Sequence, residues 1–108
     1  MYIDDCIYGI DRIMHSNIET PINLGSNELV DINSLVDIVE DIVGVKLERT
    51  YKLDAPKGVN GRNSDNTLIK QLLGWEPGTS LRQGMRETCE WIRGEYEAMA
   101  ALRSAKSA

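Results

Sequence analysis

Apolar residues recur along the chain at helical spacing in four places. Ile3, Ile7, Ile10 and Met14 lie three or four residues apart, which predicts one apolar stripe along a helix. The same periodicity predicts three more helices. Their apolar positions are Leu35, Ile38, Val39 and Ile42, then Leu68, Ile69, Leu72 and Leu73, and finally Leu81, Met85, Thr88, Ile92, Tyr96 and Met99.

Polar residues and glycines mark the expected ends of these helices. Asp4 or Asp5 can cap the first helix, and Asp31 or Asn33 can cap the second. The remaining signals are Gly44 and Gly74 as C-terminal caps, Asp65 before the third helix, and Ser80 with Gln83 as a capping box for the last.

Two shorter segments have the pattern of strands. The run from Pro21 to Leu24 predicts a buried strand, and the alternation from Val45 to Leu53 predicts a strand with one exposed face. Strands alternating with helices predict an α/β fold, rich in helix with a few short strands. We expect one domain over residues 1–102, with 103–108 as a frayed tail.

Composition narrows the class of protein. The 108 residues carry a net charge of -5, which disfavours binding to nucleic acid. No apolar run approaches the roughly 20 residues that a membrane span needs, and the start "MYIDDC" lacks the basic region of a signal peptide. We therefore expect a cytoplasmic protein.

The residues that usually carry chemistry give few candidates. Cys6 and Cys89 lack metal-ligand spacing and are expected to be reduced packing residues. His15 is expected to cap the end of the first helix rather than to act in catalysis. GxGxxG, GxxGxxG, YxxxK and GxSxG are absent from these 108 residues, so no catalytic residue and no metal ligand is assigned.

Two further groups have ordinary structural interpretations. The acidic residues Asp37, Glu40 and Asp41 predict the solvated face of the second helix. Trp75 and Trp91 adjoin helical apolar positions and are expected in the core rather than as stacking platforms.

Positive charge is concentrated in residues 46–62. This stretch contains five cations and only two acidic residues, Glu48 and Asp54, which gives it a net charge of +3 in an acidic chain. The segment is either an ordinary solvated surface or an electropositive rim that faces an anionic ligand. The five cations are Lys46, Arg49, Lys52, Lys57 and Arg62.

Arg62 is the strongest binding candidate because it lies in the small, polar stretch "GVNGRNSDN". Gly58 and Gly61 leave backbone N–H groups uncovered, and a guanidinium can bind a phosphate through two parallel hydrogen bonds. The alternative is that Arg62 pairs with Asp65 or Asp54 and pins the loop. The local pattern leaves both interpretations open.

Four segments together resemble a known family. They are "YIDDC", "PINLGSNELVDINSLVDIVEDIVG", "GVNGRNSDNTLIKQLLGWEP" and "LRQGMRETCEWI". In order and spacing they resemble the C-terminal region of extended short-chain dehydrogenase/reductase enzymes, the NAD-dependent epimerase/dehydratase family. Within it they are most similar to the nucleotide-sugar epimerases that act on GDP-mannose. The similarity extends over nearly the whole chain.

The resemblance implies the C-terminal substrate-binding portion of an extended Rossmann-type fold. Arg62 matches the family arginine that binds the nucleotide diphosphate, which favours the phosphate interpretation, with Gly61, Asn63 and Asp65 as possible loop support. Asn60 stands where relatives often have another arginine. In this family the NAD site and the acid and base lie upstream, so Cys6 is not the catalytic cysteine.

Two hypotheses follow. In the first, the chain is the part of an NAD-dependent nucleotide-sugar epimerase that binds a GDP-mannose-like substrate; alone it binds no NAD and is inactive. In the second, it is a non-catalytic binding or structural module that self-associates through the surface which a dinucleotide-binding domain would otherwise cover.

Overall fold

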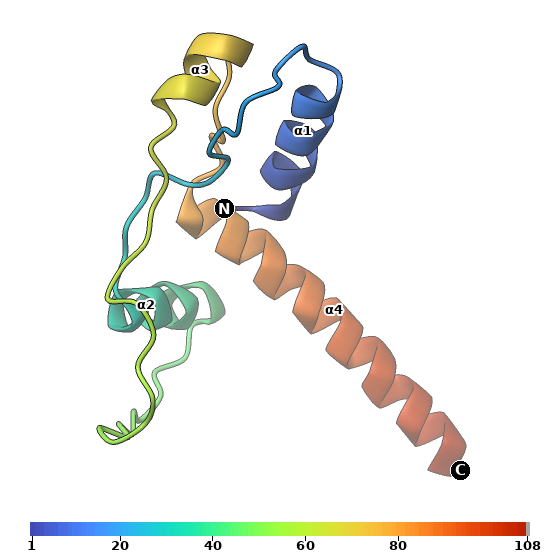
Figure 1. Ribbon diagram of the computed structural model, residues 1–108. Coiled ribbons are helices and arrows are strands. Elements are labelled where there is room, and N and C mark those ends of the chain that lie inside the picture. Colours follow the sequence, from blue (N-terminus) through green and yellow to red (C-terminus); the bar gives the residue numbers. More distant parts are fainter. Residues whose placement is uncertain (108) are drawn as a thin grey trace.

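Four helices joined by long connections make up the fold (Figure 1). The structure is a computed structural model and describes residues 1–107. The helices are α1 (Ile3–Met14), α2 (Ile32–Val43), α3 (Thr67–Leu73) and α4 (Leu81–Ser107). All four helices predicted from the apolar periodicity are present.

Most of the predicted end signals act as expected. Asp31 is the N-cap of α2 and accepts a 2.9 Å hydrogen bond from the Ser34 backbone N–H. Gly44 and Gly74 end α2 and α3 with φ of 71° and 59°, in the left-handed region that favours glycine. At α4 the Gln83 N–H donates to Ser80 Oγ at 3.2 Å, the first half of the expected capping box.

Other end signals act differently from the prediction. The N-cap of α1 is Tyr2, whose side chain makes no cap hydrogen bond. Asp4 and Asp5 lie instead in the first turn, where their charge favours the positive end of the helix dipole. Asp65 precedes Asn66, which is the N-cap of α3. Its carboxylate accepts a 2.9 Å hydrogen bond from the N–H of Thr67, the first residue of the helix.

The two predicted strands are wrong: within residues 1–107 the structure has no strand. A strand requires a neighbouring strand for its backbone hydrogen bonds, and neither segment has one. Residues 45–49 are held by α2 instead, because the Val45 and Leu47 N–H groups donate to Glu40, at 3.1 Å in each case. The described chain is therefore all-helical rather than α/β.

A small core lies where α1, α3 and the first connection meet. Ile69 of α3 is the one fully buried large side chain among the described residues. Gly9 of α1 is buried against Leu24 and Trp75; a Cβ there would lie 2.6 Å from Leu24 Cδ1. Trp75 also contacts the Tyr8 ring edge to face, with ring centroids 5.0 Å apart.

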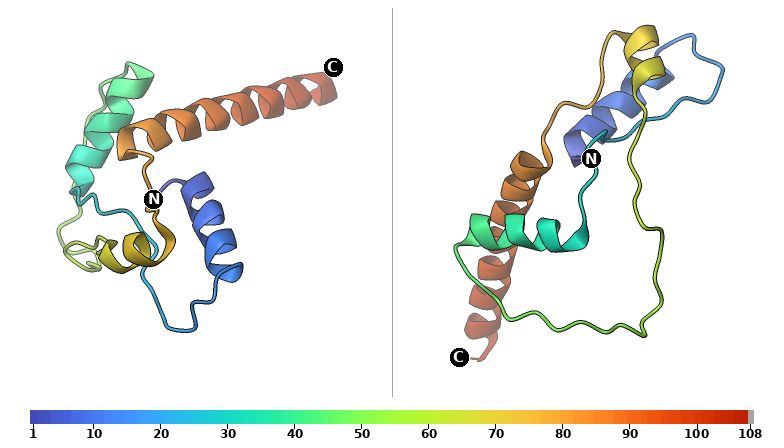
Figure 2. Two further views of the ribbon diagram at one scale, coloured as in Figure 1. Left: turned by 90° about the horizontal axis from the view of Figure 1, so that it is seen from above. Right: turned by 90° about the vertical axis from the view of Figure 1, so that its left-hand side faces the viewer.

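The molecule as a whole is open. Its radius of gyration is 18.6 Å, against about 13 Å for a compact domain of this length. Its accessible surface is 8836 Å², whereas a compact monomer of this mass exposes about 6,000 Å². Helix α4 packs beside α2 near its start and then extends away from the other helices (Figures 1 and 2).

Much of the predicted apolar face is consequently exposed. The stripe of α1 is open, with Ile3 and Ile7 each 59% exposed. Trp91, which we expected in the core, is also exposed, whereas Trp75 is half-buried. Residues 103–107, where we expect fraying, are the last turns of α4. Whether they fray in solution stays a prediction.

Candidate functional site

Two segments far apart in the sequence lie side by side and form the candidate site. The Ser64 N–H donates to the Ser26 carbonyl at 2.8 Å. Asn63 Nδ2 donates to the Asn27 carbonyl at 3.2 Å, and Asn66 Nδ2 donates to the Gly25 carbonyl at 2.9 Å. These three hydrogen bonds join the "NLGSN" segment to the "GRNSDN" segment.

Gly25 allows this close approach. A Cβ at position 25 would lie 2.8 Å from Ser64 Cβ, closer than real side chains come. Asn66 anchors the crossing from the other side, since it is buried and accepts from Ser64 Oγ at 2.7 Å. A larger residue at position 25 would separate the two segments and displace the residues that flank Arg62.

A cavity of about 410 Å³ opens beside this crossing. Arg62 lies in its wall and is exposed. Among the residues that the structure describes, no ion pair or hydrogen bond joins the Arg62 guanidinium to Asp54 or Asp65. The structure therefore shows no contact through which Arg62 would pin the loop. The other lining residues are Met1, Asn23, Leu24, Gly25, Ser26, Glu28, Asn63 and Ser64.

The expected supporting residues have distinct positions around Arg62. Asn63 ties the loop to the first segment through Asn27. Gly61 lies against Leu29; a Cβ there would be 3.1 Å from Leu29 Cδ1. Asp65 faces α3, where the Thr67 hydroxyl and backbone N–H together lower the pKa of its carboxyl. Whether any of them contributes to ligand binding stays a prediction.

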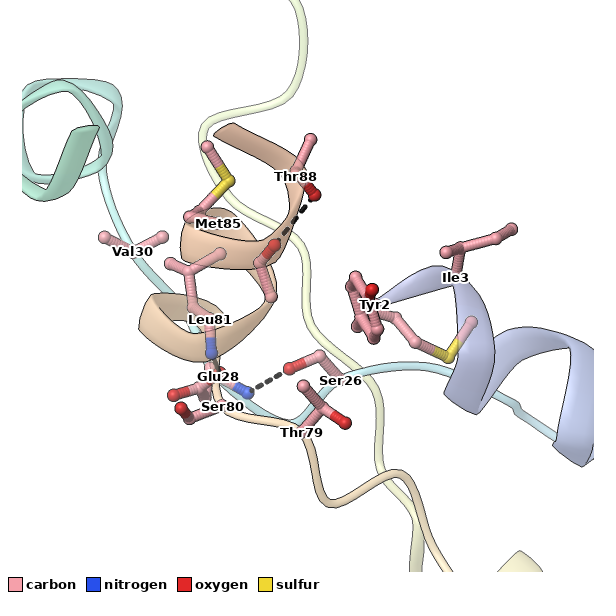
Figure 3. Close-up of a pocket in the computed structure, with 12 residues that line it drawn as sticks. Tyr2, Ile3, Ser26, Glu28, Val30, Thr79, Ser80, Leu81, Met85 and Thr88 are labelled. Atoms are coloured by element: carbon pink, nitrogen blue, oxygen red, sulfur yellow. Dashed lines mark hydrogen bonds between the residues drawn. The ribbon is translucent and has the colours of Figure 1, made fainter. Parts of the chain in front are cut away.

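A second cavity, of about 390 Å³, adjoins the first and shares Met1, Ser26 and Glu28 with it. Figure 3 shows Tyr2, from the residues before α1, facing the first turns of α4 across this space. Glu28 accepts a 2.7 Å hydrogen bond from the Leu81 N–H and so caps α4. The hydrogen bond with Glu87 raises the pKa of Tyr2 from its ordinary 10 to about 12.

Two of the five cations in the basic segment are neutralised by α2. Arg49 Nη2 lies 2.6 Å from Asp37 Oδ1 and 2.9 Å from Glu40 Oε2, and Lys46 Nζ lies 2.9 Å from Glu40 Oε2. These pairs also correct the interpretation of the acidic run. Glu40 is 3% exposed, not solvated, and Asp37 and Asp41 alone are exposed. Lys52, Lys57 and Arg62 have no such pair among the described residues, and of these three only Arg62 lines the cavity.

The remaining candidates have structural environments. His15 is the C-cap residue of α1, as expected, with Nδ1 2.9 Å from the Asp11 carbonyl oxygen. Cys6 and Cys89 are free, half-buried thiols. In the part of the chain that ends at Ser107, no group of three or more His, Cys, Asp or Glu could hold a metal ion.

Sequence reasoning missed the partner segment of the site. Ser26, Glu28 and Ser64 line the cavity with Arg62, and none of them was a candidate. The available signal was that both segments belong to the set of resembling motifs, which indicates proximity but not which atoms meet.

None of the helices within residues 1–107 is long and apolar enough to cross a membrane.

Comparison with known proteins identifies relatives of this chain. It is 41% identical over 96 residues, 89% of its length, to GDP-mannose 3,5-epimerase from Arabidopsis thaliana. It is 31% identical over 99 residues to UDP-glucuronic acid decarboxylase 1 from Xenopus tropicalis, and 29% identical over 103 residues to UDP-glucuronate 4-epimerase from Thermodesulfobacterium geofontis. No family model matches the chain.

These matches cover only part of each relative. The chain spans 25% of the Arabidopsis enzyme, 24% of the Xenopus enzyme and 32% of the bacterial one. Over nearly all of its own length, the chain is homologous to about a quarter of GDP-mannose 3,5-epimerase and of related nucleotide-sugar epimerases and decarboxylases.

Proposed function

We propose that this chain is the portion of an NAD-dependent nucleotide-sugar epimerase that binds the sugar nucleotide, and that Arg62 binds the diphosphate of a GDP-mannose-like ligand. The observation that carries the proposal is the position of Arg62 in a polar cavity without a protein partner in the described chain. An exposed guanidinium held beside serine and asparagine side chains is a suitable site for a phosphate group.

The variety of the relatives supports a role directed at the diphosphate. Their names include GDP-mannose and UDP-glucuronic acid, which differ in both base and sugar. The two compounds share the ribose and the diphosphate, and of these only the diphosphate is charged. A binding residue in the region common to both proteins is therefore expected to contact phosphate oxygens rather than one base or one sugar.

The way in which the loop is held supports the same role. Asn63 and Ser64, the two residues after Arg62, are hydrogen-bonded to the neighbouring segment at 3.2 and 2.8 Å. Their backbone is thus fixed before any ligand arrives, and less conformational entropy is lost on binding. Each charge-assisted hydrogen bond from the guanidinium contributes about 1.5 to 3 kcal/mol.

Two features limit the affinity of the isolated chain. Asn60 supplies no charge where relatives often have an arginine, and Glu28 brings a carboxylate into the same cavity. Part of the Glu28 charge is engaged by the Leu81 N–H. We expect weak binding, and we expect the hydride transfer to and from NAD to require residues outside this chain.

Calorimetric titration with GDP, GDP-mannose and UDP-glucuronic acid tests this role. Removal of one charge-assisted bond predicts roughly ten- to hundredfold weaker binding by Arg62→Ala, and removal of two predicts a larger loss. Lys52→Ala is the matched control because it removes an exposed cation of the same segment that does not line the cavity. We expect it to change the affinity less than about twofold. Equal binding by wild type and Arg62→Ala would show that the proposed phosphate role is wrong.

A further inference from the structure

The outer half of α4 presents an apolar face that the other residues within 1–107 leave uncovered. Both directions of view show this half extending beyond the other helices (Figures 1 and 2). Exposed fractions of its large apolar side chains range from 53% to 70%. These side chains are Trp91, Ile92, Tyr96, Met99 and Leu102.

Helical geometry gathers these five side chains on one side. At 3.6 residues per turn they fall within an arc of roughly 140°. Glu90, Arg93 and Glu97 lie on the opposite side of the helix. Three charged residues lie within the apolar arc. Along the helix, Glu95 lies toward the N-terminal end of the outer half, and Arg103 and Lys106 lie toward its C-terminal end. The face therefore carries its own negative and positive charges, separated along the helix.

The whole chain, of which the α4 face is one part, exposes more surface than a compact monomer of its mass. The chain exposes roughly 2,800 Å² more than a compact monomer of its mass. Stable protein interfaces bury about 1,200 to 2,000 Å² in total, and obligate ones bury more. Burial of the α4 face against an equal face would remove part of this excess from water.

We propose that a second copy of this chain packs antiparallel against the outer half of α4, with the two-fold axis near Met99. In that arrangement Tyr96 faces the partner's Leu102, and Glu95 faces the partner's Arg103. The same contacts recur on the other side of the axis, as in any two-fold interface. The antiparallel direction also aligns the two helix dipoles favourably.

The parallel arrangement is less favourable. It would place Glu95 beside its own counterpart and Arg103 beside its own, so that like charges meet along the interface. It would also bring the two sets of α1, α2 and α3 together at one end. In the antiparallel pair these helices lie at opposite ends of the contact. The proposal is independent of any ligand at Arg62.

Sedimentation equilibrium of the 108-residue chain tests the pairing. We expect a dimer with twice the monomer mass of 12.1 kDa. Glu95→Arg and Arg103→Glu should each raise the dimer dissociation constant at least about tenfold because each creates like-charge contacts. The double variant should restore the wild-type value. A variant that merely failed to fold would not regain dimerisation through a second substitution.

A control on another helix identifies the face involved. Ile7→Glu alters an equally exposed apolar residue of α1 and should leave dimerisation unchanged. In a Cys6→Ser, Cys89→Ser background, Met99→Cys should form a disulfide-linked dimer, whereas Glu97→Cys should not. A monomeric wild-type chain, or charge variants that leave the dissociation constant unchanged, would overturn the proposal.

Discussion

Glu40 fixes the segment that follows α2. Its carboxylate accepts from Lys46 Nζ and Arg49 Nη2, each at 2.9 Å, and from the Leu47 N–H at 3.1 Å. Because Glu40 is buried while Lys46 is largely exposed, the cluster lies at the edge of the protein. Its effect is to bring residues 45–49 back across α2, so that the chain leaves toward the Arg62 loop in a defined direction.

The charge of Glu40 predicts a pH dependence of stability. The hydrogen bond from Lys46, then the Leu47 N–H and Arg49, lowers the pKa of Glu40 from its ordinary 4.5 to about 2. A lowered folded-state pKa contributes stability that is complete above the unfolded pKa and is lost as the pH falls through the folded pKa. The Glu40 contribution should therefore disappear between pH 4.5 and about 2.

Urea unfolding of wild type and Glu40→Gln over this pH range measures the contribution. The variant should be less stable than wild type above pH 4.5, and the difference should shrink toward pH 2. Glu48→Gln alters an exposed carboxylate of the same segment and should behave as wild type at both ends. A constant difference between Glu40→Gln and wild type would contradict the assignment.

At the scale of helices, two glycines have opposite requirements. Gly44 ends α2 with φ of 71°, a conformation that L-residues with a side chain rarely adopt. Gly94 lies inside α4 in open space, with nothing within 4 Å of a Cβ built on it. The same substitution by alanine should therefore act in opposite directions at the two positions.

Thermal unfolding followed by circular dichroism tests this expectation. Gly44→Ala should destabilise the chain by roughly 1 to 2 kcal/mol because alanine is strained at positive φ. Gly94→Ala should stabilise α4 by about 0.5 to 1 kcal/mol because glycine is unfavourable inside a helix. Stabilisation by Gly44→Ala would contradict the backbone assignment at Gly44, and destabilisation by Gly94→Ala would contradict the open environment of Gly94.

These elements also show which features the sequence could predict. The helices and the caps at Asp31, Gly44 and Gly74 were predictable because each depends on residues within one or two turns. The strand from Val45 to Leu53 was not, because strand formation depends on a neighbour that local alternation does not reveal. Arg62 was found as a candidate because its signal is local. Its partner segment at residues 23–27 was missed because that contact joins segments far apart in the sequence.

At the scale of the whole molecule, the main feature is that many large apolar side chains are exposed to solvent. The homologous enzymes are about four times as long as the matched region, since the chain spans 25% of the Arabidopsis relative. A chain with one fully buried large side chain among residues 1–107 gains little stability from its own core. Much of its exposed area is thus available for contact with other protein surfaces.

The missing dinucleotide-binding motifs predict that the 108-residue chain alone does not bind NAD. Glycine-rich phosphate turns of the GxxGxxG kind are absent from its sequence. Titration calorimetry should give no saturable NAD isotherm under conditions where GDP binding is measurable. A saturable NAD signal that survives Arg62→Ala would reveal a cofactor site outside the cavity described above.

The crossing of the two segments at Gly25 and Ser64 has a consequence for how the chain can vary during evolution. Arg62 is positioned from its C-terminal side, by bonds at Asn63, Ser64 and Asn66. The residues from 51 to 61 are exposed throughout. Insertions and deletions before Gly61 can therefore be accepted without displacing the guanidinium, whereas one extra residue between Ser64 and Asn66 would shift the crossing out of register.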